Sequence, residues 1–223
     1  MGINRTYLLD KKGYMSAFST NVDCRFVGNS SLFFHPADIV SCRQIHSDII
    51  KIVDESMRGT EVPDCDALIT NVPNLPLLIR TADCVPVVLF DECRRVVANI
   101  HSGRVGTQKQ IVRKTVEMMR SQFGSSPSDI IAAMGPHICG KCYEVDAACA
   151  SEFGEQFVVG CSIDQKPVID IASACKEQLE SSGVHSKNIF ISDICTAESP
   201  EWPSWRRDKC SERLGTFIVL EKK

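Results

Sequence analysis

The chain has 223 residues, of which 43% are apolar and 24% charged, and its formal net charge is −3. This length allows one large domain with a substantial core, and the near-neutral charge provides no general basic surface for nucleic acid. No apolar run approaches the roughly 20 residues that span a bilayer, so we expect a cytoplasmic protein without a nucleic-acid or membrane partner.

The N-terminal sequence carries no clear targeting signal. MGINRTYLLDKKGY lacks the long apolar segment of a secretory signal. It matches the Met-Gly-x-x-x-Ser/Thr myristoylation pattern through Gly2 and Thr6, but so short a pattern is often matched by chance. The location therefore stays cytoplasmic in our interpretation.

The internal organisation indicates one unit. No repeat, low-complexity segment or linker interrupts the sequence, which predicts a single domain over residues 1–223. The 12 cysteines do not indicate a disulfide framework, because disulfide-dense scaffolds are mostly short and secreted. We expect most of them to be reduced thiols.

The clearest strands come in the middle of the chain. Residues 75–90 and 94–101, LPLLIRTADCVPVVLF and RRVVANIH, are rich in Val, Ile and Leu. The charged turn DECRR between them predicts an antiparallel pair.

A helix is predicted next, over residues 107–123. Its apolar positions fall on one helical face, namely Val112, Val116, Met119 and Phe123. Thr107 is the expected N-cap.

The remaining elements complete a mixed pattern. Three strands are predicted at residues 130–135, 188–194 and 216–221, and two helices at residues 144–157 and 169–183, the second ended by Gly183. Strands and helices do not alternate regularly, which favours an α+β domain with mixed sheets flanked by helices over a doubly wound fold.

Polar residues that could act in catalysis or binding lie where the apolar runs end. Side chains at such positions commonly reach a functional site. They are Arg43, Gln44 and His46; Asp64, Cys65 and Asp66; Arg80, Asp83 and Cys84; and His101.

Three of these residues suggest a metal centre. His46, Cys84 and His101 offer two imidazoles and one thiolate, and three protein ligands with a vacant fourth position are typical of catalytic zinc. Two alternatives use the same atoms. The histidines could be hydrogen-bonded strand-end residues beside a packed thiol, or Cys84 and His101 could form a nucleophilic thiolate–imidazole pair with Asp83 or Asn99 orienting the ring.

Three further motifs are less specific. CGKC, residues 139–142, is a single Cys-x-x-Cys that could be half a zinc site or a redox pair, although a plain loop after Gly135-Pro136 is favoured. GRVG, residues 103–106, offers backbone N–H groups at a helix start to a phosphate, without a Walker A pattern. Arg206 and Arg207 beside Trp205 could grip a phosphate or form an exposed turn.

The ordered motifs RQIHS, CDALIT, RTADCVPVVLF, NIHSGRVGT, MGPHICGKCYEV and SWRRD resemble, over roughly residues 42–220, the blocks of the laccase-domain or polyphenol oxidoreductase family. That family is now understood as purine nucleoside phosphorylases with adenosine deaminase activity. The resemblance implies a layered α+β fold similar to a bacterial cytotoxic deamidase. It also implies one zinc ion per chain, held by His46, Cys84 and His101, with copper as an alternative ion.

The sequence departs from the family at two places. The family usually reads His-Ala-Gly-Trp-Arg-Gly where this chain has residues 101–106, HSGRVG, so an aromatic is missing and the arginine comes one place earlier. The segment at residues 21–42 is shorter than in the family. Nucleoside and phosphate contacts from both regions are therefore not carried over.

The resemblance leads to a functional expectation. We expect a zinc-dependent phosphorylase that acts on adenosine, inosine and S-methyl-5′-thioadenosine with phosphate, plus adenosine deaminase activity. Cys84, His101, His46 and Asp83 are the expected catalytic residues, and the expected phosphate- or substrate-binding residues are Arg43, Arg80, Arg104, Arg206 and Arg207. The preferred nucleoside and the oligomeric state are left open.

Three other functions remain as alternatives. The first is a metal-free hydrolase or deamidase that uses Cys84 and His101. The second is a copper-dependent polyphenol oxidase, which the five histidines disfavour because several copper centres need about ten. The third is a binding protein that has lost turnover through its altered HSGRVG loop.

Overall fold

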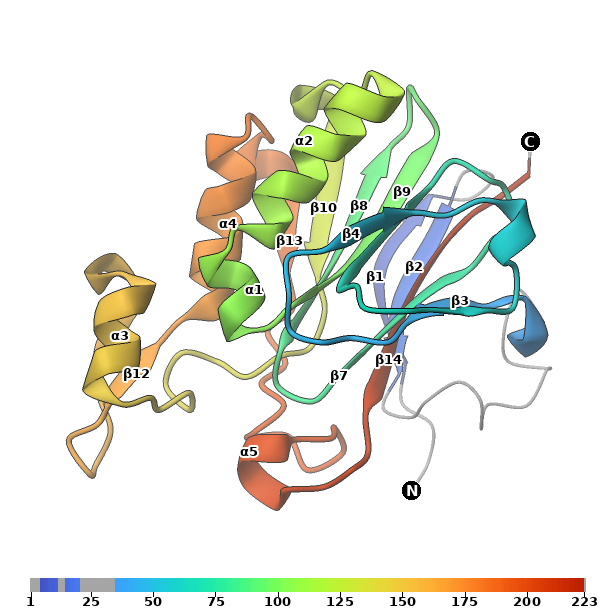
Figure 1. Ribbon diagram of the computed structural model, residues 1–223. Coiled ribbons are helices and arrows are strands. Elements are labelled where there is room, and N and C mark those ends of the chain that lie inside the picture. The colour runs from blue at the N-terminus through green and yellow to red at the C-terminus, as the bar shows by residue number, and fades with distance from the viewer. Residues whose placement is uncertain (1–4, 12–14, 21–34, 223) are drawn as a thin grey trace.

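The computed structural model describes residues 5–11, 15–20 and 35–222, and these form a layered α+β structure. Two six-stranded mixed sheets pack face to face, and helices cover the outer face of the second sheet (Figure 1). The expected fold class is confirmed. Gly2 of the myristoylation match and residues 21–34 of the shortened segment lie outside the described residues, and the single-domain organisation stays a prediction.

The first sheet has the strand order β1-β2-β14-β7-β3-β5. Its strands are β1 (Arg5–Lys11), β2 (Met15–Thr20), β14 (Leu214–Leu220), β7 (Leu77–Thr81), β3 (Val40–Cys42) and β5 (Glu61–Val62). The C-terminal strand β14 thus lies between β2 and β7, antiparallel to both.

The second sheet has the order β13-β10-β8-β9-β6-β4. Its strands are β13 (Ile189–Ile191), β10 (Ile130–Met134), β8 (Val85–Asp91), β9 (Val96–Ser102), β6 (Ala67–Thr70) and β4 (Ile50–Ile52). The predicted antiparallel pair is β8 and β9, joined by the charged turn.

Two cores separate the layers. The central strand β8 is buried on both faces, and its side chains alternate between the cores as strand geometry requires. Val87 and Leu89 pack with the helices, whereas Val88 and Phe90 pack between the sheets. This explains why the run from residue 85 to 90 is continuously apolar rather than alternating.

The helices are α1 (Arg104–Gln108), α2 (Ile111–Phe123), α3 (Ala147–Phe153), α4 (Ile171–Ser181) and α5 (Trp205–Asp208). Helices α2 and α4 cover the second sheet (Figure 1). Short 3₁₀ turns occupy Pro36–Asp38, Glu55–Met57, Pro127–Asp129, Glu155–Phe157 and Ser186–Asn188. None of the helices in the described part of the chain is long and apolar enough to cross a membrane.

The helix predicted at residues 107–123 is in fact two helices. Gln110 adopts a left-handed backbone with φ 63°, which ends α1 and starts α2. Thr107 is therefore not an N-cap. It lies inside α1, where its buried hydroxyl donates to the Gly103 carbonyl. The predicted apolar face of α2 is correct, with Val112, Val116 and Met119 buried.

The chain changes sheets at the interruption in the long apolar run. Strand β7 belongs to the first sheet and β8 to the second, so residues 82–84 form the crossover between the two layers. Asp83 takes a left-handed conformation there, with φ 88°. Cys84 consequently lies at the ends of the strands, between the end of β7 in one sheet and the start of β8 in the other.

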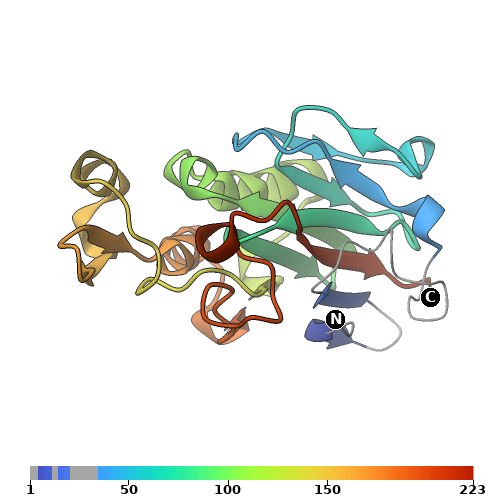
Figure 2. The ribbon, with the colours of Figure 1, turned by 90° about the horizontal axis from the view of Figure 1, so that it is seen from below.

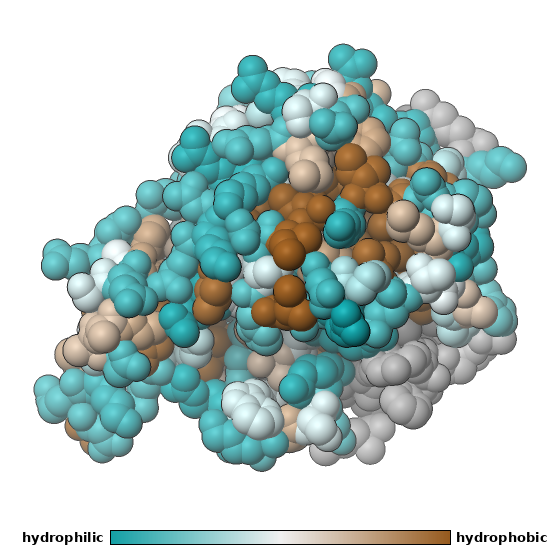
Figure 3. Space-filling model, in the orientation of Figure 1, coloured by the Kyte–Doolittle hydropathy of each residue, from teal (hydrophilic) through white to brown (hydrophobic). Residues whose placement is uncertain are grey.

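Helix α3 and the small hairpin of β11 (Val158–Cys161) and β12 (Pro167–Ile169) lie at one end of the molecule, away from the two large sheets (Figure 2). In the orientation of Figure 1, apolar residues gather on the surface over β4 and the loop before it (Figure 3). The exposed isoleucines of this segment are Ile45, Ile49 and Ile52.

Candidate metal centre

Three side chains meet beside the strand ends at which the chain crosses from one sheet to the other. His46 lies in the loop between β3 and β4, Cys84 in the crossover, and His101 near the end of β9. One ligand atom from each residue lies within 4.8 Å of those of the other two. The imidazole rings meet edge to face, with centroids 4.8 Å apart. The fold brings together the three residues that the sequence suggested, from positions far apart in the chain.

Asp66 organises this cluster from beneath. It is fully buried, and its carboxylate lies 2.7 Å from His101 Nδ1. The same carboxylate accepts backbone N–H bonds from Ile45, His46 and Ser47, which fixes the loop that carries His46 in its left-handed conformation, φ 57°. A carboxylate on Nδ1 leaves Nε2 of His101 for a metal, the usual support of a ligating imidazole.

Burial and hydrogen bonding oppose each other at Asp66. Burial raises its pKa, but the bonds from His101 and Ser47 outweigh burial and lower the pKa to about 2. The carboxylate is therefore ionised at neutral pH and supplies a fixed negative charge below the cluster.

Cys84 and His101 shift each other's pKa. Burial alone would raise the pKa of the Cys84 thiol, but the charge of His101 and hydrogen bonds from His101 and His46 lower it to about 6. Burial lowers the pKa of His101, and the thiolate of Cys84 and the hydrogen bond to Asp66 raise it to about 9. A thiolate is the form that both a metal and an electrophile require.

Gly103 lies against the three side chains, at a distance where only a hydrogen atom fits between them. A Cβ at this position would lie 3.0 Å from His46 Cδ2, 3.1 Å from Cys84 Sγ and 3.5 Å from His101 Cε1. Its backbone φ is −77°, so any residue could adopt the conformation. Glycine is therefore required here because a larger residue would collide with the three side chains, and not because of the backbone conformation.

We expect Gly103→Ala to lower the affinity for a divalent ion by roughly tenfold, because the new methyl group pushes His46 and Cys84 apart and misplaced ligands typically cost 10–100-fold in affinity. The thermal unfolding midpoint of the metal-free protein should change little. Competition with a chromogenic chelator measures the affinity. Equal affinities in the two proteins would show that the ion is not held by these side chains.

The cluster opens into a pocket of about 780 Å³, within the range of small-molecule sites. Five arginines line it: Arg43, Arg80, Arg104, Arg206 and Arg213. The acidic residues that line it are Glu61 and Asp83. The pocket therefore carries a positive excess beside the cluster and is suited to an anion.

The pocket arginines are held to different degrees. Arg80 pairs with Glu61 at 3.4 Å, and the Gln44 side chain bonds both backbone groups of Arg80. Arg206 donates to the Glu144 carbonyl at 2.9 Å and lies over the Tyr143 ring. Arg43 is exposed and pairs with Asp64.

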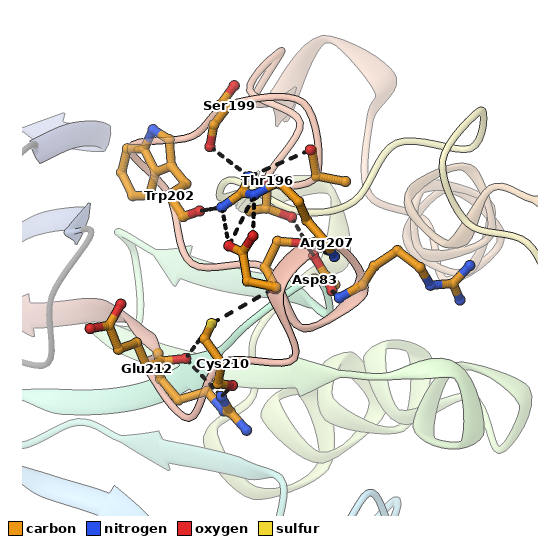
Figure 4. Close-up of polar contacts among 12 residues, drawn as sticks. Asp83, Thr196, Ser199, Trp202, Arg207, Cys210 and Glu212 are labelled. Carbon is orange, nitrogen blue, oxygen red and sulfur yellow. Dashed lines mark hydrogen bonds and ion pairs between the residues drawn. The ribbon is translucent and has the colours of Figure 1, made fainter.

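Asp83 does not orient an imidazole, so the orienting role considered for it is wrong, and its hydrogen bonds do not support the catalytic role expected for it. Its carboxylate accepts hydrogen bonds from the Thr196 and Ser204 hydroxyls and from the Arg206 backbone N–H. Figure 4 shows Asp83 beside the segment that leads into α5. Asp83 therefore ties the crossover next to Cys84 to this C-terminal segment and has a structural role.

Arg207 does not line the pocket, so the phosphate role expected for it is not supported. Its guanidinium pairs with Asp208 and donates to the carbonyls of Thr196, Ser199 and Trp202 (Figure 4). These bonds join Arg207 to the loop that precedes α5.

Sequence reasoning missed three residues of the site. Asp66 was among the candidates without a role, and its place beside β9 follows only from the pairing of β6 with β9. Tyr143 and Arg213 line the pocket; Tyr143 lies in the MGPHICGKCYEV motif but was given no role, and Arg213 is in none of the motifs. Asn99, considered as an orienting group for His101, instead donates to two backbone carbonyls of the first sheet.

Comparisons with known proteins identify the family of the chain. Residues 24–221 match the family described as multi-copper polyphenol oxidoreductase laccase. A purine nucleoside phosphorylase of Streptomyces coelicolor is 35% identical over 199 residues, covering 88% of this chain and 81% of its own. One of Clostridium acetobutylicum is 37% identical over 197 residues, covering 86% and 81%.

Solved structures give the same fold. The hypothetical protein YfiH of Bacillus licheniformis superposes with a TM-score of 0.85 at 25% identity, covering 96% of this chain and 99% of its own. YlmD of Geobacillus stearothermophilus gives 0.84 at 24% identity, covering 97% and 99%.

Proposed function

This chain belongs to the multi-copper polyphenol oxidoreductase laccase family, and from that membership and the pocket geometry we propose that it is a zinc-dependent purine nucleoside phosphorylase. The proposed substrates are adenosine, inosine and S-methyl-5′-thioadenosine with phosphate, and the proposed second activity is deamination of adenosine. The single observation that carries the proposal is the cluster of His46, Cys84 and His101 opening into an arginine-lined pocket. The names of the relatives at 35% and 37% identity support it.

The donor set fits a catalytic zinc ion. Two imidazoles and a thiolate suit the borderline softness of zinc, and three protein ligands leave a coordination position for substrate or water. The close approach of Gly103 to the three side chains and the ionised carboxylate of Asp66 on His101 support this assignment. When bound, Zn²⁺ supplies Lewis acidity and lowers the pKa of a bound water.

The pocket residues have complementary tasks. Arg80, Arg104 and Arg206 would hold the phosphate, since guanidinium groups bind phosphate oxygens in pairs. Trp205 lines the pocket and is half exposed, so its ring could receive the flat purine by stacking. This position would replace the aromatic residue that is missing from the HSGRVG loop.

A copper oxidase function is not supported by the residues present. Copper centres of oxidases need several histidines each, and the chain has five in all. Within the described residues, histidine enters one of the two groups that could hold a metal, and it enters with a single cysteine. This donor set suits one ion, as the phosphorylase proposal requires.

The proposed location is the cytoplasm. The 11 cysteines in the described part of the chain are free thiols, which supports a reducing compartment.

The function is tested by product analysis. We expect the zinc-loaded protein to convert adenosine and phosphate into adenine and ribose 1-phosphate, and to convert adenosine into inosine without phosphate. Treatment with a strong chelator should abolish both conversions, and added zinc should restore them. Absence of every product with fully loaded protein would refute the proposal.

A metal-free cysteine hydrolase is the second candidate, and one observation favours it. Cys84, His101 and Asp66 are ordered as nucleophile, base and orienting carboxylate, with a thiol pKa of about 6. In that case activity would persist in chelator, and zinc would not protect Cys84 from alkylation. The chelator experiment therefore separates the two candidates.

A further inference from the structure

A second cluster of metal-binding side chains lies outside the pocket. Cys139, Cys142, Cys195 and Glu198 each present one ligand atom, and these atoms all lie within 4.8 Å of one another. In a tetrahedral zinc site with bonds of about 2.3 Å, sulfur atoms are about 3.8 Å apart, so only a small contraction is needed. We propose that these four residues bind a second, structural zinc ion.

Two short turns with the same spacing build the cluster. Cys139 and Cys142 are the ends of one turn, closed by the Cys142 N–H on the Cys139 carbonyl at 3.0 Å. Cys195 and Glu198 are the ends of another, closed by the Glu198 N–H on the Cys195 carbonyl at 3.2 Å. The two turns therefore form a Cys-x-x-Cys pair and a Cys-x-x-Glu pair. Structural zinc sites are typically built from two such pairs of ligands.

The two turns are held against each other before any ion binds. His137 and Cys195 form a parallel β-bridge, and the Thr196 N–H donates to the His137 carbonyl. The Cys139 N–H points at Cys195 Sγ, 3.3 Å away. The Cys195 sulfur is thereby held facing the turn that carries the other two cysteines.

The four proposed ligands differ in their exposure to solvent. Cys195 is 5% exposed, the other two cysteines are half-buried, and Glu198 is exposed. Burial raises the pKa of the Cys139 and Cys142 thiols, so an incoming ion must displace their protons to water. Glu198 lies on the open side and provides the entry path.

A disulfide explains the cluster less well. It would join two of the three sulfurs, require an oxidant, and leave the third thiol and the carboxylate without a role. A zinc ion uses all four groups and needs no change of oxidation state. The residue types and their spacing therefore favour the ion.

The position of the cluster suggests what the ion stabilises. Cys142 directly precedes Tyr143 in the pocket wall, and Arg206 donates to the carbonyl of Glu144. On the other side, Thr196 directly follows Cys195 and binds Asp83. The ion would clamp the loop after β10 to the segment after β13 and so hold one wall of the pocket, without contacting the substrate.

Metal analysis of the full chain tests this proposal independently of any enzymatic activity. We expect two zinc ions per wild-type chain, one in Cys84→Ala, one in Cys142→Ser and none in the double variant. Cys161→Ser, which removes an exposed cysteine from the surface strand β11, is the matched control and should keep both. A Cys84→Ala chain that holds no zinc, or a Cys142→Ser chain with the same zinc content as wild type, would overturn the second site.

A second variant guards against misfolding of Cys142→Ser. In the Cys84→Ala background, Co²⁺ bound at the cluster should give strong thiolate-to-metal charge transfer, and Glu198→Gln should weaken Co²⁺ binding about tenfold. Because Glu198 is exposed, folding should be unaffected. Unchanged affinity in Glu198→Gln would overturn the four-ligand site, as would mass spectrometry of the unreduced wild-type protein that finds a disulfide among the three cysteines.

Discussion

Cys84→Ala should lose the metal of the pocket and lower the turnover of adenosine by on the order of 10³-fold or more. The thiolate is the only sulfur ligand of the cluster, and its negative charge is also the main partner of His101. Without it, two imidazoles remain, one of them exposed. Loss of several kcal/mol of metal-derived stabilisation corresponds to such a rate decrease.

The measurements are zinc content and steady-state rates with saturating phosphate. Cys93→Ser is the control, because Cys93 is an exposed thiol in the turn between β8 and β9. It should retain both the metal and the full rate. If Cys84→Ala kept wild-type activity, the cluster would have no role in the reaction, whatever the zinc content of the variant.

Asp66→Asn should have the second largest effect, on both metal binding and stability. The amide cannot carry the charge that supports His101, and its NH₂ group replaces an oxygen that accepts backbone N–H bonds of the His46 loop. We expect the zinc affinity to fall 10–100-fold. Above pH 4, the free energy of unfolding should fall by about 2 kcal/mol, since the pKa of Asp66 lies almost two units below its usual value.

The pH dependence gives this prediction a distinct signature. A carboxyl group with a lowered folded-state pKa stabilises the protein above its unfolded-state pKa near 4, and this contribution is lost as the pH falls toward about 2. Asp66→Asn should therefore be less stable than wild type at pH 6, and the difference should shrink between pH 4 and pH 2. Urea unfolding of the metal-free proteins measures it.

Asp64→Asn is the matched control for Asp66→Asn. Asp64 lies two residues away, and its side chain is 57% exposed and pairs with the exposed Arg43. Such surface pairs contribute little to stability, so this variant should resemble wild type at every pH. An equal loss in the two variants would mean that the charge of the segment matters rather than the buried bonds of Asp66.

The sequence predicted what depends on local pattern. Continuous apolar runs rich in Val, Ile and Leu located β8, β9, β10 and β14. The apolar face of α2 was correct because a 3.6-residue period is a local property. The ligand set His46, Cys84 and His101 was also found, since unusual polar residues at the ends of apolar runs are visible without any tertiary information. The family motifs strengthened that set.

What the sequence could not give depends on contacts between distant segments. Whether Asp66 or Asp83 supports His101 is decided by the pairing of β6 with β9, and both aspartates look alike in the sequence. In the sequence Arg207 resembles a phosphate-binding residue, but in the structure its guanidinium donates to backbone carbonyls of the loop before α5. Likewise, the short helix α1 exists because Gln110 accepts a left-handed backbone, a conformation that no periodicity reveals.

The crossover at residues 82–84 has a consequence for how the ion and the fold depend on each other. Cys84 joins a strand of one layer to a strand of the other, while His101 belongs to the second layer and the His46 loop starts from the first. An ion bound by all three is released as soon as the layers separate at this edge. Release of the proposed ion, followed with a chromogenic chelator, is therefore expected to report the separation of the two layers under conditions where the secondary structure is still intact.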